Sequence, residues 1–179
     1  MSFWPTVTFP STFDCSHLHP FDLEFHTSPK DGQIQERYRV RVFFSCHCFT
    51  TLQKPGDDPR LEVTHAKSKH DPRSFNETRW ELSKQLPSIV RDFMNRKAFH
   101  TGKGNYVIVE ILGRDGVPCE YGVYFELNRN SREKRLHLDI QSAYLHDDES
   151  RNRSGQRRPI QFKFLIHSVQ TGKKVKVSY

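Results

Sequence analysis

The strongest constraint on the fold is a two-residue alternation of apolar and polar side chains between Glu36 and Thr50. One set of side chains comprises Tyr38, Val40, Val42, Phe44, Cys46 and Cys48, and the residues between them form the other. Successive side chains of a strand point to opposite faces, so this period predicts a long strand with one apolar face. Arg135–Tyr144 alternates in the same way, and we expect a second strand there.

The segment Glu77–Phe99 is predicted to form one long helix. Its apolar residues recur every three to four positions, which is typical of an amphipathic helix. They are Trp80, Leu86, Ile89, Val90, Phe93 and Met94. Asn76 suits the N-cap position. Pro87 lacks a backbone donor, so we expect a kink or two consecutive helices near Leu86.

Further strands are expected at Asp22–His26, Leu61–Thr64, Tyr106–Leu112, Glu120–Asn128, Ile160–His167 and Lys174–Val177. Short turns between sequential strands favour antiparallel pairing. The predicted fold class is therefore α+β, with one long, Pro-kinked helix packed on a mainly antiparallel sheet of about five strands. Residues 1–35, rich in Pro, Ser, Thr and Phe, are expected to be an irregular N-terminal arm, and residues 36–179 a single α+β domain.

Positive charge is concentrated near the C-terminus. Residues 1–150 contain 20 Lys and Arg against 21 Asp and Glu, whereas residues 151–179 contain 8 basic residues and no acid. The basic residues are Arg151, Arg153, Arg157, Arg158, Lys163, Lys173, Lys174 and Lys176. Such a concentration indicates a polyanion partner, with a solvated basic tail as the alternative interpretation.

The sequence also predicts where the protein works. No run approaches the roughly 20 apolar residues of a membrane span, and the first residues lack the pattern of a signal peptide. We expect a cytoplasmic protein without a membrane partner.

Cys46 and Cys48 would point to one strand face and His47 to the other, and no second Cys pair has zinc-site spacing. Core cysteines are therefore favoured over a metal site, and we expect no cofactor.

His47 is the first candidate for acid–base chemistry. On the predicted strand it shares the more polar face with Arg39 and Arg41. A histidine titrates near neutral pH, and flanking guanidinium groups suit a phosphodiester substrate. The alternative is a histidine that only hydrogen-bonds to a neighbouring loop.

The outward row of the strand Arg135–Tyr144 is the second candidate. It comprises Arg135, His137, Asp139 and Gln141. Metal-free RNA cleavage needs a base, an acid and cations that stabilise the phosphorane, and Glu126 on the preceding strand can lie opposite this row. The alternative is a solvent-facing surface of cross-strand charge pairs.

Four short segments carry a resemblance. They are Phe44-Ser45-x-His47-x-Phe49-Thr50, Arg79-Trp80-x-Leu82-Ser83-x-x-Leu86-Pro87, Asn105-Tyr106 and Ser142-Ala143-Tyr144. Together they resemble a group of uncharacterised bacterial proteins carried on plasmids, prophages and other mobile elements. The order of a helix followed by an antiparallel meander is also similar to the barnase/EndoU/colicin/RelE class of small ribonucleases.

These observations lead to three functional hypotheses. The first is a nucleic-acid-directed protein of a mobile element, acting as a metal-independent ribonuclease-like enzyme. His47, or His137 with Asp139, would transfer protons, while Arg39, Arg41 and the basic C-terminal residues hold the backbone, with RNA expected rather than DNA. The second is a non-catalytic nucleic-acid-binding module. The third is a protein-interaction factor in stress, growth adaptation or host takeover.

Overall fold

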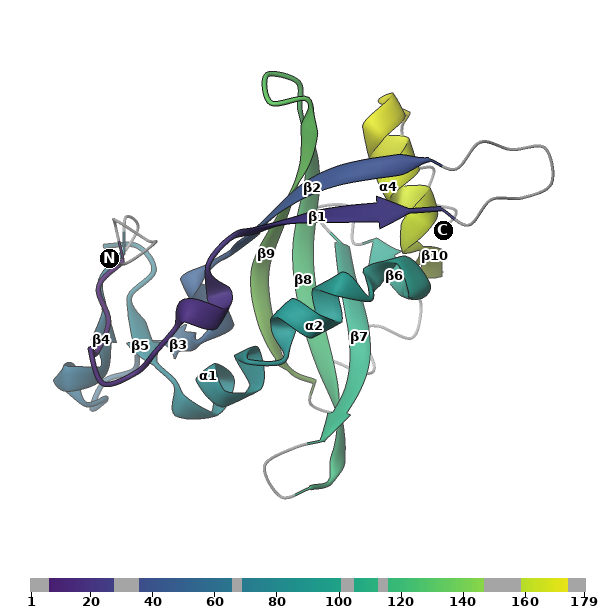
Figure 1. Cartoon of the computed structure of the whole chain (residues 1–179). Helices are drawn as coiled ribbons and strands as arrows, with labels where there is room; N and C mark the ends of the chain where they lie inside the picture. The colour runs from purple at the N-terminus through teal and green to yellow at the C-terminus, as the bar shows by residue number, and fades with distance from the viewer. Residues whose placement is uncertain are drawn as a thin grey trace.

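The computed structural model describes residues 7–27, 36–65, 69–100, 105–112, 116–146 and 159–173. Its centre is a strongly curled seven-stranded sheet with the strand order β1-β2-β9-β8-β7-β6-β10 (Figure 1). The strands are β1 (Phe21–His26), β2 (Arg37–Phe44), β6 (Lys97–His100), β7 (Asn105–Leu112), β8 (Pro118–Asn130), β9 (Arg135–Leu145) and β10 (Pro159–Gln161). Only β2 and β9 pair in parallel; the other pairs of this sheet are antiparallel.

The two faces of the sheet differ as the alternation predicts. On β9, Leu136, Leu138 and Ile140 are buried, and the residues between them point to the opposite, outer face. The inner face is covered by α2 (Leu86–Arg91), the 3-10 helix η4 (Phe93–Asn95) and α4 (Phe162–Thr171) (Figure 1). Ring centroids of Phe93 and Phe162 lie 5.1 Å apart in the resulting core.

A second, three-stranded sheet lies beside the first, with the order β3-β5-β4. Its strands are β3 (Thr50–Leu52), β4 (Glu62–Val63) and β5 (Arg73–Phe75). The 3-10 helix η2 (Cys46–Cys48) connects β2 to this sheet, and α1 (Glu77–Ser83) follows it. Two further 3-10 helices, η1 (Ser16–Leu18) and η3 (Pro59–Leu61), complete the described elements.

The predicted fold class is wrong, because short helices cover a seven-stranded sheet where one long helix on about five strands was expected. The expected break near Leu86 is present: α1 ends at Ser83 and α2 begins at Leu86, with Pro87 in its first turn, where a missing N–H costs nothing. The helical segment then ends at Asn95, and Lys97–His100 forms β6, held between β7 and β10.

The strand predicted at Ile160–His167 is also wrong. Only Pro159–Gln161 is extended, and α4 follows. Its apolar residues Phe162, Leu165, Ile166 and Val169 have the spacing of a helical face. Gly172, at φ 71°, ends the helix in the left-handed conformation that glycine favours. The strand predicted at Lys174–Val177 lies outside the described residues.

The long strand predicted at Glu36–Thr50 ends early. β2 stops at Phe44, and the Ser45 side chain accepts a hydrogen bond from the backbone N–H of His47, which starts η2. Both Cys46 and Cys48 are buried there. The predictions of β1, β4, β7, β8 and β9 and of the Asn76 cap are confirmed. The division at residue 35 stays a prediction, although β1 pairs along the length of β2.

Candidate functional site

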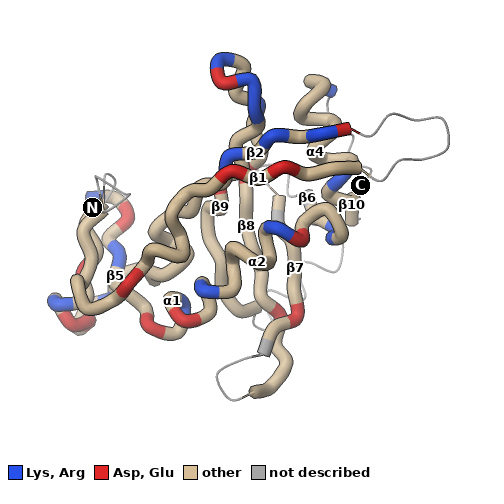
Figure 2. The backbone as a smooth tube through the Cα atoms, viewed as in Figure 1, with Lys and Arg blue, Asp and Glu red and all other residues tan. Residues whose placement is uncertain are grey.

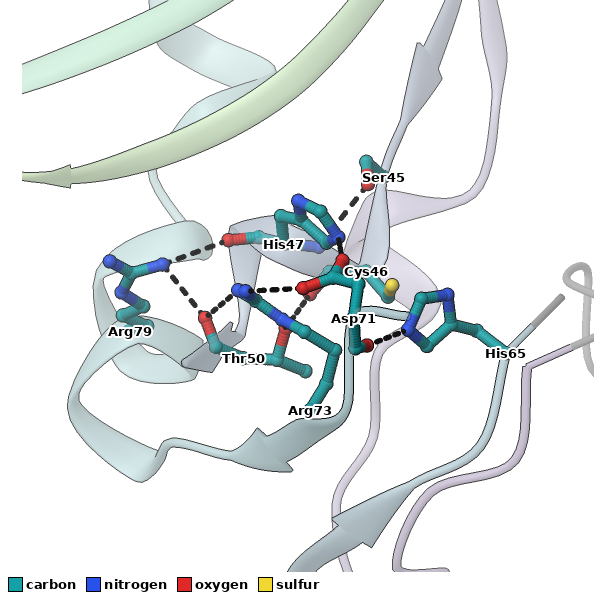
Figure 3. Close-up of polar contacts among 8 residues, drawn as sticks. All are labelled: Ser45, Cys46, His47, Thr50, His65, Asp71, Arg73 and Arg79. Atoms are coloured by element: carbon teal, nitrogen blue, oxygen red, sulfur yellow. Dashed lines mark hydrogen bonds and ion pairs between the residues drawn. The ribbon is translucent and has the colours of Figure 1, made fainter. Parts of the chain in front are cut away.

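A cluster of polar side chains lies where the two sheets meet, around Thr50 (Figure 3). The 3-10 turn after β2 reverses the chain, so His47 faces Asp71, which precedes β5. Arg73 reaches the cluster from β5 and Arg79 from α1. Four separate elements therefore supply this site, which we call the junction cluster.

His47 and Asp71 form its acid–base pair. Nε2 of His47 lies 2.8 Å from Oδ2 of Asp71. The bond fixes the tautomer: Nε2–H donates to the carboxylate, which leaves Nδ1 as a free base. Burial of the imidazole and then the charge of Arg73 lower the pKa of His47, and Asp71 opposes this shift. The ring is therefore neutral near pH 7, as a general base requires. His65 holds the other side of Asp71, with Nε2 2.7 Å from its backbone carbonyl oxygen.

Arg73 has partners for every side of its guanidinium group. Nε donates to Oγ1 of Thr50 at 3.0 Å, Nη2 to the carbonyl oxygen of Thr50 at 3.0 Å, and Nη1 approaches Oδ1 of Asp71 at 3.4 Å. The side chain is only 10% exposed. Asp71 thus orients His47 and also compensates the buried charge of Arg73.

Arg79 connects the cluster to the end of β9. Its Nη1 donates to the carbonyl oxygens of Thr50 and His47 at 2.7 and 3.2 Å. Its Cζ lies 5.1 Å from the ring centroid of Tyr144, which stacks on Tyr124 at 5.0 Å and 12°. Three of the segments that carry the resemblance, containing His47 and Thr50, Arg79, and Tyr144, therefore meet in space.

The tyrosine stack is packed tightly against the sheet. The hydroxyl of Tyr124 lies 3.0 Å from Nε2 of His146. This imidazole covers Gly122: a Cβ at that position would lie 2.2 Å from Nε2 of His146. A side chain at position 122 would therefore have to displace the His146 ring from the Tyr124 hydroxyl.

The outer face of the main sheet carries a different kind of charge arrangement. Asp22 of β1 pairs with Arg41 at 2.7 Å and with Arg135 at 2.9 Å. Glu24 likewise pairs with Arg37 at 3.0 Å and with Arg39 at 3.7 Å. A groove of about 280 Å³ is lined by the charged residues Asp22, Glu24, Arg39, Glu133 and Arg135. We call Arg37, Arg39, Arg41 and Arg135 the outer-face arginines; Figure 2 shows basic residues along β2 and in the β8–β9 hairpin.

The second predicted catalytic group lies on this same outer face. His137 is opposite Arg41, and Asp139 is opposite Glu126. His137 Nε2 lies 3.3 Å from a Glu133 carboxylate oxygen. Burial raises the pKa of Asp139. The charge of His137 opposes this shift, and the charge of Glu126 adds to it.

The predicted site residues therefore separate into two groups. Arg39, Arg41, Glu126, Arg135, His137 and Asp139 share the outer face. The contacts of His47 and those of His137 have no residue in common. Of the basic C-terminal residues, Lys163 and Lys173 are described, whereas Arg151, Arg153, Arg157, Arg158 and Lys174 lie outside the described residues.

Sequence reasoning missed the partners of His47. Asp71 and Arg73 lie outside the strands and the helix expected from the sequence, and Arg79 was singled out only as part of the resemblance. The available signal was that Asp71 and Arg73 flank Pro72 and lead into a short stretch that ends in the aromatic Phe75.

The described residues contain no group of three or more His, Cys, Asp or Glu side chains that could hold a metal ion. Among the described helices, none has the length and apolar character that crossing a membrane requires.

Comparison with known proteins gives one family. The YjaZ family profile matches residues 6–170. A curated relative, Protein YjaZ of Escherichia coli (strain K12), is 25% identical over 125 residues, which is 69% of this chain and 69% of the relative. No solved structure matches significantly.

Proposed function

The chain belongs to the YjaZ family, and from this premise we propose that it is a nucleic-acid-binding protein that contacts phosphates through its outer-face arginines. The observation that carries the proposal is the cluster of four arginines on this surface, which pair with Asp22 and Glu24 of β1 and, through Arg135, with Glu133. The adjoining hairpin adds the exposed cations Arg129, Arg132 and Lys134 and the one carboxylate of Glu133.

The existing ion pairs do not prevent this binding. The arginine side chains are 32–66% exposed, and exposed ion pairs contribute only about 0–1 kcal/mol each. Phosphate oxygens can therefore replace the carboxylates at small cost. Phe43 lies on the same face, with its ring centroid 5.1 Å from that of His137, and offers a surface on which an unpaired base can stack. This favours single-stranded RNA as the ligand.

The proposal is tested by titrating labelled single-stranded RNA with the protein at several salt concentrations. Removing one cation that binds a phosphate should reduce the slope of log affinity against log salt by about 0.7 for a single strand. We expect this reduction and weaker binding for Arg39→Ala. The matched control is Arg60→Ala, because Arg60 is exposed and paired with Asp58, away from this face.

Equal affinity and slope in the wild type and Arg39→Ala would refute the proposal. A DNA strand of the same sequence tests the preference for RNA. Recovery of a specific acidic protein from nuclease-treated extract, without RNA binding, would favour the protein-interaction hypothesis. Carriage on a mobile element and a cytoplasmic location stay predictions.

Metal-independent RNA cleavage is a second candidate, which the His47–Asp71 pair favours. A neutral imidazole oriented by a carboxylate has the arrangement of a general base. Incubation with end-labelled RNA in the presence of EDTA should give cleavage that His47→Ala abolishes and Asp71→Asn reduces. Cleavage that persists in His47→Ala and disappears in His137→Ala would place the catalytic site on the outer face. If the wild type does not cleave RNA, this second candidate is refuted and RNA binding is the remaining function.

A further inference from the structure

Two guanidinium groups share one carbonyl oxygen in the junction cluster. Arg73 donates to the Thr50 carbonyl oxygen at 3.0 Å and Arg79 to the same atom at 2.7 Å. Asp71 is the carboxylate that contacts the cluster, and it pairs with Arg73. With His47 neutral, the cluster therefore carries an excess positive charge.

The excess charge belongs to Arg79. Its side chain forms its hydrogen bonds through Nη1 alone, so Nε and Nη2 have no protein partner within the described chain. Both nitrogens remain in contact with solvent, because neither is a fully buried atom without a hydrogen-bond partner. Arg79 also has no carboxylate within ion-pair distance among the described residues. In Figure 3 its second terminal nitrogen points away from the cluster.

An arginine in this position is unusual because its burial is costly. Burial of the guanidinium, followed by repulsion from Arg73, lowers the pKa of Arg79. Buried charges are generally paired, and an unpaired one is destabilising. Cζ of Arg79 lies 5.1 Å from the ring centroid of Tyr144, and this cation–π contact attracts the guanidinium without neutralising it.

We propose that Arg79 is an oxyanion-binding residue that holds a phosphate group through Nε and Nη2. These two donors form the planar fork that binds two phosphate oxygens at once. The Tyr144–Tyr124 stack lies beside Arg79, and an aromatic ring attached to the phosphate can pack against its edge, since Arg79 and Tyr124 already cover the ring of Tyr144. The site is separate from the outer-face arginines and does not depend on the function proposed for them.

The test measures modification of individual arginines in the wild-type protein by phenylglyoxal, followed by mass spectrometry. Inorganic phosphate is titrated at constant ionic strength, with chloride as the balancing ion. Modification of Arg79 should slow by about tenfold when phosphate reaches about ten times its dissociation constant. Arg60, which is paired with Asp58 and exposed, is the internal control and should keep its rate. An Arg79 rate that does not change across the titration overturns the proposal.

Adenosine monophosphate distinguishes the source of the phosphate. Protection at lower concentration than inorganic phosphate supports a nucleotide that stacks on the tyrosines, and equal protection supports a site for phosphate alone. Tyr144→Leu keeps Arg79 available for modification and should weaken protection by about threefold through loss of the cation–π contact. If both ligands protect Arg79 as well in Tyr144→Leu as in the wild type, Tyr144 is not part of the site.

A variant at Arg79 itself gives an independent measurement. Arg79→Lys keeps the charge but not the fork, and phosphate should raise the melting temperature of the wild type more than that of this variant. An equal rise in both would overturn the proposal. If the protein does not bind RNA in the salt titration but phosphate still protects Arg79, the proposed function is refuted and the phosphate site at Arg79 is supported.

Discussion

The outer face and the junction cluster both hold more arginines than carboxylates that pair with them, but in very different surroundings. On the outer face, four arginines share Asp22 and Glu24, and their side chains are 32–66% exposed. In the junction cluster, Arg73 pairs with Asp71 and is 10% exposed, whereas Arg79 donates to the carbonyl oxygen of Thr50. The comparison shows that burial, rather than the number of charges, separates the two regions.

The physical reason is solvation. Water screens the excess charge of the outer face, so its ion pairs can be exchanged for other partners at small cost. In the junction cluster, Arg73 is largely shielded from water, and its donors are matched to hydroxyl, carbonyl and carboxylate oxygens. Four predictions test this contrast, from the largest expected effect to the smallest.

Removal of one arginine from each region should give the clearest difference. Arg73→Ala should lower the free energy of unfolding by about 3 kcal/mol, because it removes a buried charge that pairs with Asp71 and donates to the hydroxyl and carbonyl oxygens of Thr50. Arg41→Ala should lower it by about 0.5 kcal/mol. Urea denaturation measures both; if Arg73→Ala does not fold, Arg73→Lys takes its place with an intermediate loss. Similar losses at the two positions would contradict the contrast.

Acid should destabilise the protein through buried histidines. Burial is the main cause that lowers the pKa of His47 and of His17. The unfolded chain then binds protons at higher pH than the native state, so stability is complete above about pH 6.5 and is lost as pH falls through the folded pKa values. Urea denaturation between about pH 7.5 and pH 5 should show a smaller decrease in His47→Asn than in the wild type; identical decreases would contradict this assignment.

The outer face should tolerate loss of a carboxylate. Asp139 lies directly opposite Glu126. Burial is the main cause that raises the pKa of Asp139; the charge of His137 opposes this shift, and the charge of Glu126 adds to it. Asp139→Asn removes this repulsion and should raise the free energy of unfolding by about 0.5 kcal/mol at neutral pH. Gln141→Glu, on the same strand beside Glu126, is the opposite change and should lower stability. A loss of stability in Asp139→Asn would show that the carboxylate has a structural role.

The smallest effect is expected near Arg79. Tyr121 is fully buried, and its hydroxyl has no hydrogen-bond partner among the described residues. Tyr121→Phe therefore removes no bond, and the free energy of unfolding should change by less than about 0.5 kcal/mol, or increase. Tyr38→Phe is the matched control, because the Tyr38 hydroxyl lies 3.1 Å from Nδ1 of His167 and also contacts Glu36, and it should lower stability. A marked loss in Tyr121→Phe would reveal a partner for its hydroxyl.

Local sequence predicts much of the sheet and little of its arrangement. β9 and β8 follow from alternation, because their inner residues pack on the core and their outer residues meet water. The strand predicted at Ile160–His167 failed because a short apolar run fits both periods, and the spacing of Phe162, Leu165 and Ile166 is helical. The parallel pairing of β2 with β9 depends on segments almost a hundred residues apart in the chain.

The candidate site shows the same division. His47, His137 and Arg135 were identified by residue type and strand face, which are local properties. By itself, the sequence determined the alternation of β9, the cap at Asn76 and the break before Pro87, because each depends on a few neighbouring residues. The tertiary structure alone decided that Asp71 meets His47, that Arg79 reaches Tyr144, and that His47 and His137 have separate sets of contacts, because these depend on how distant segments pack.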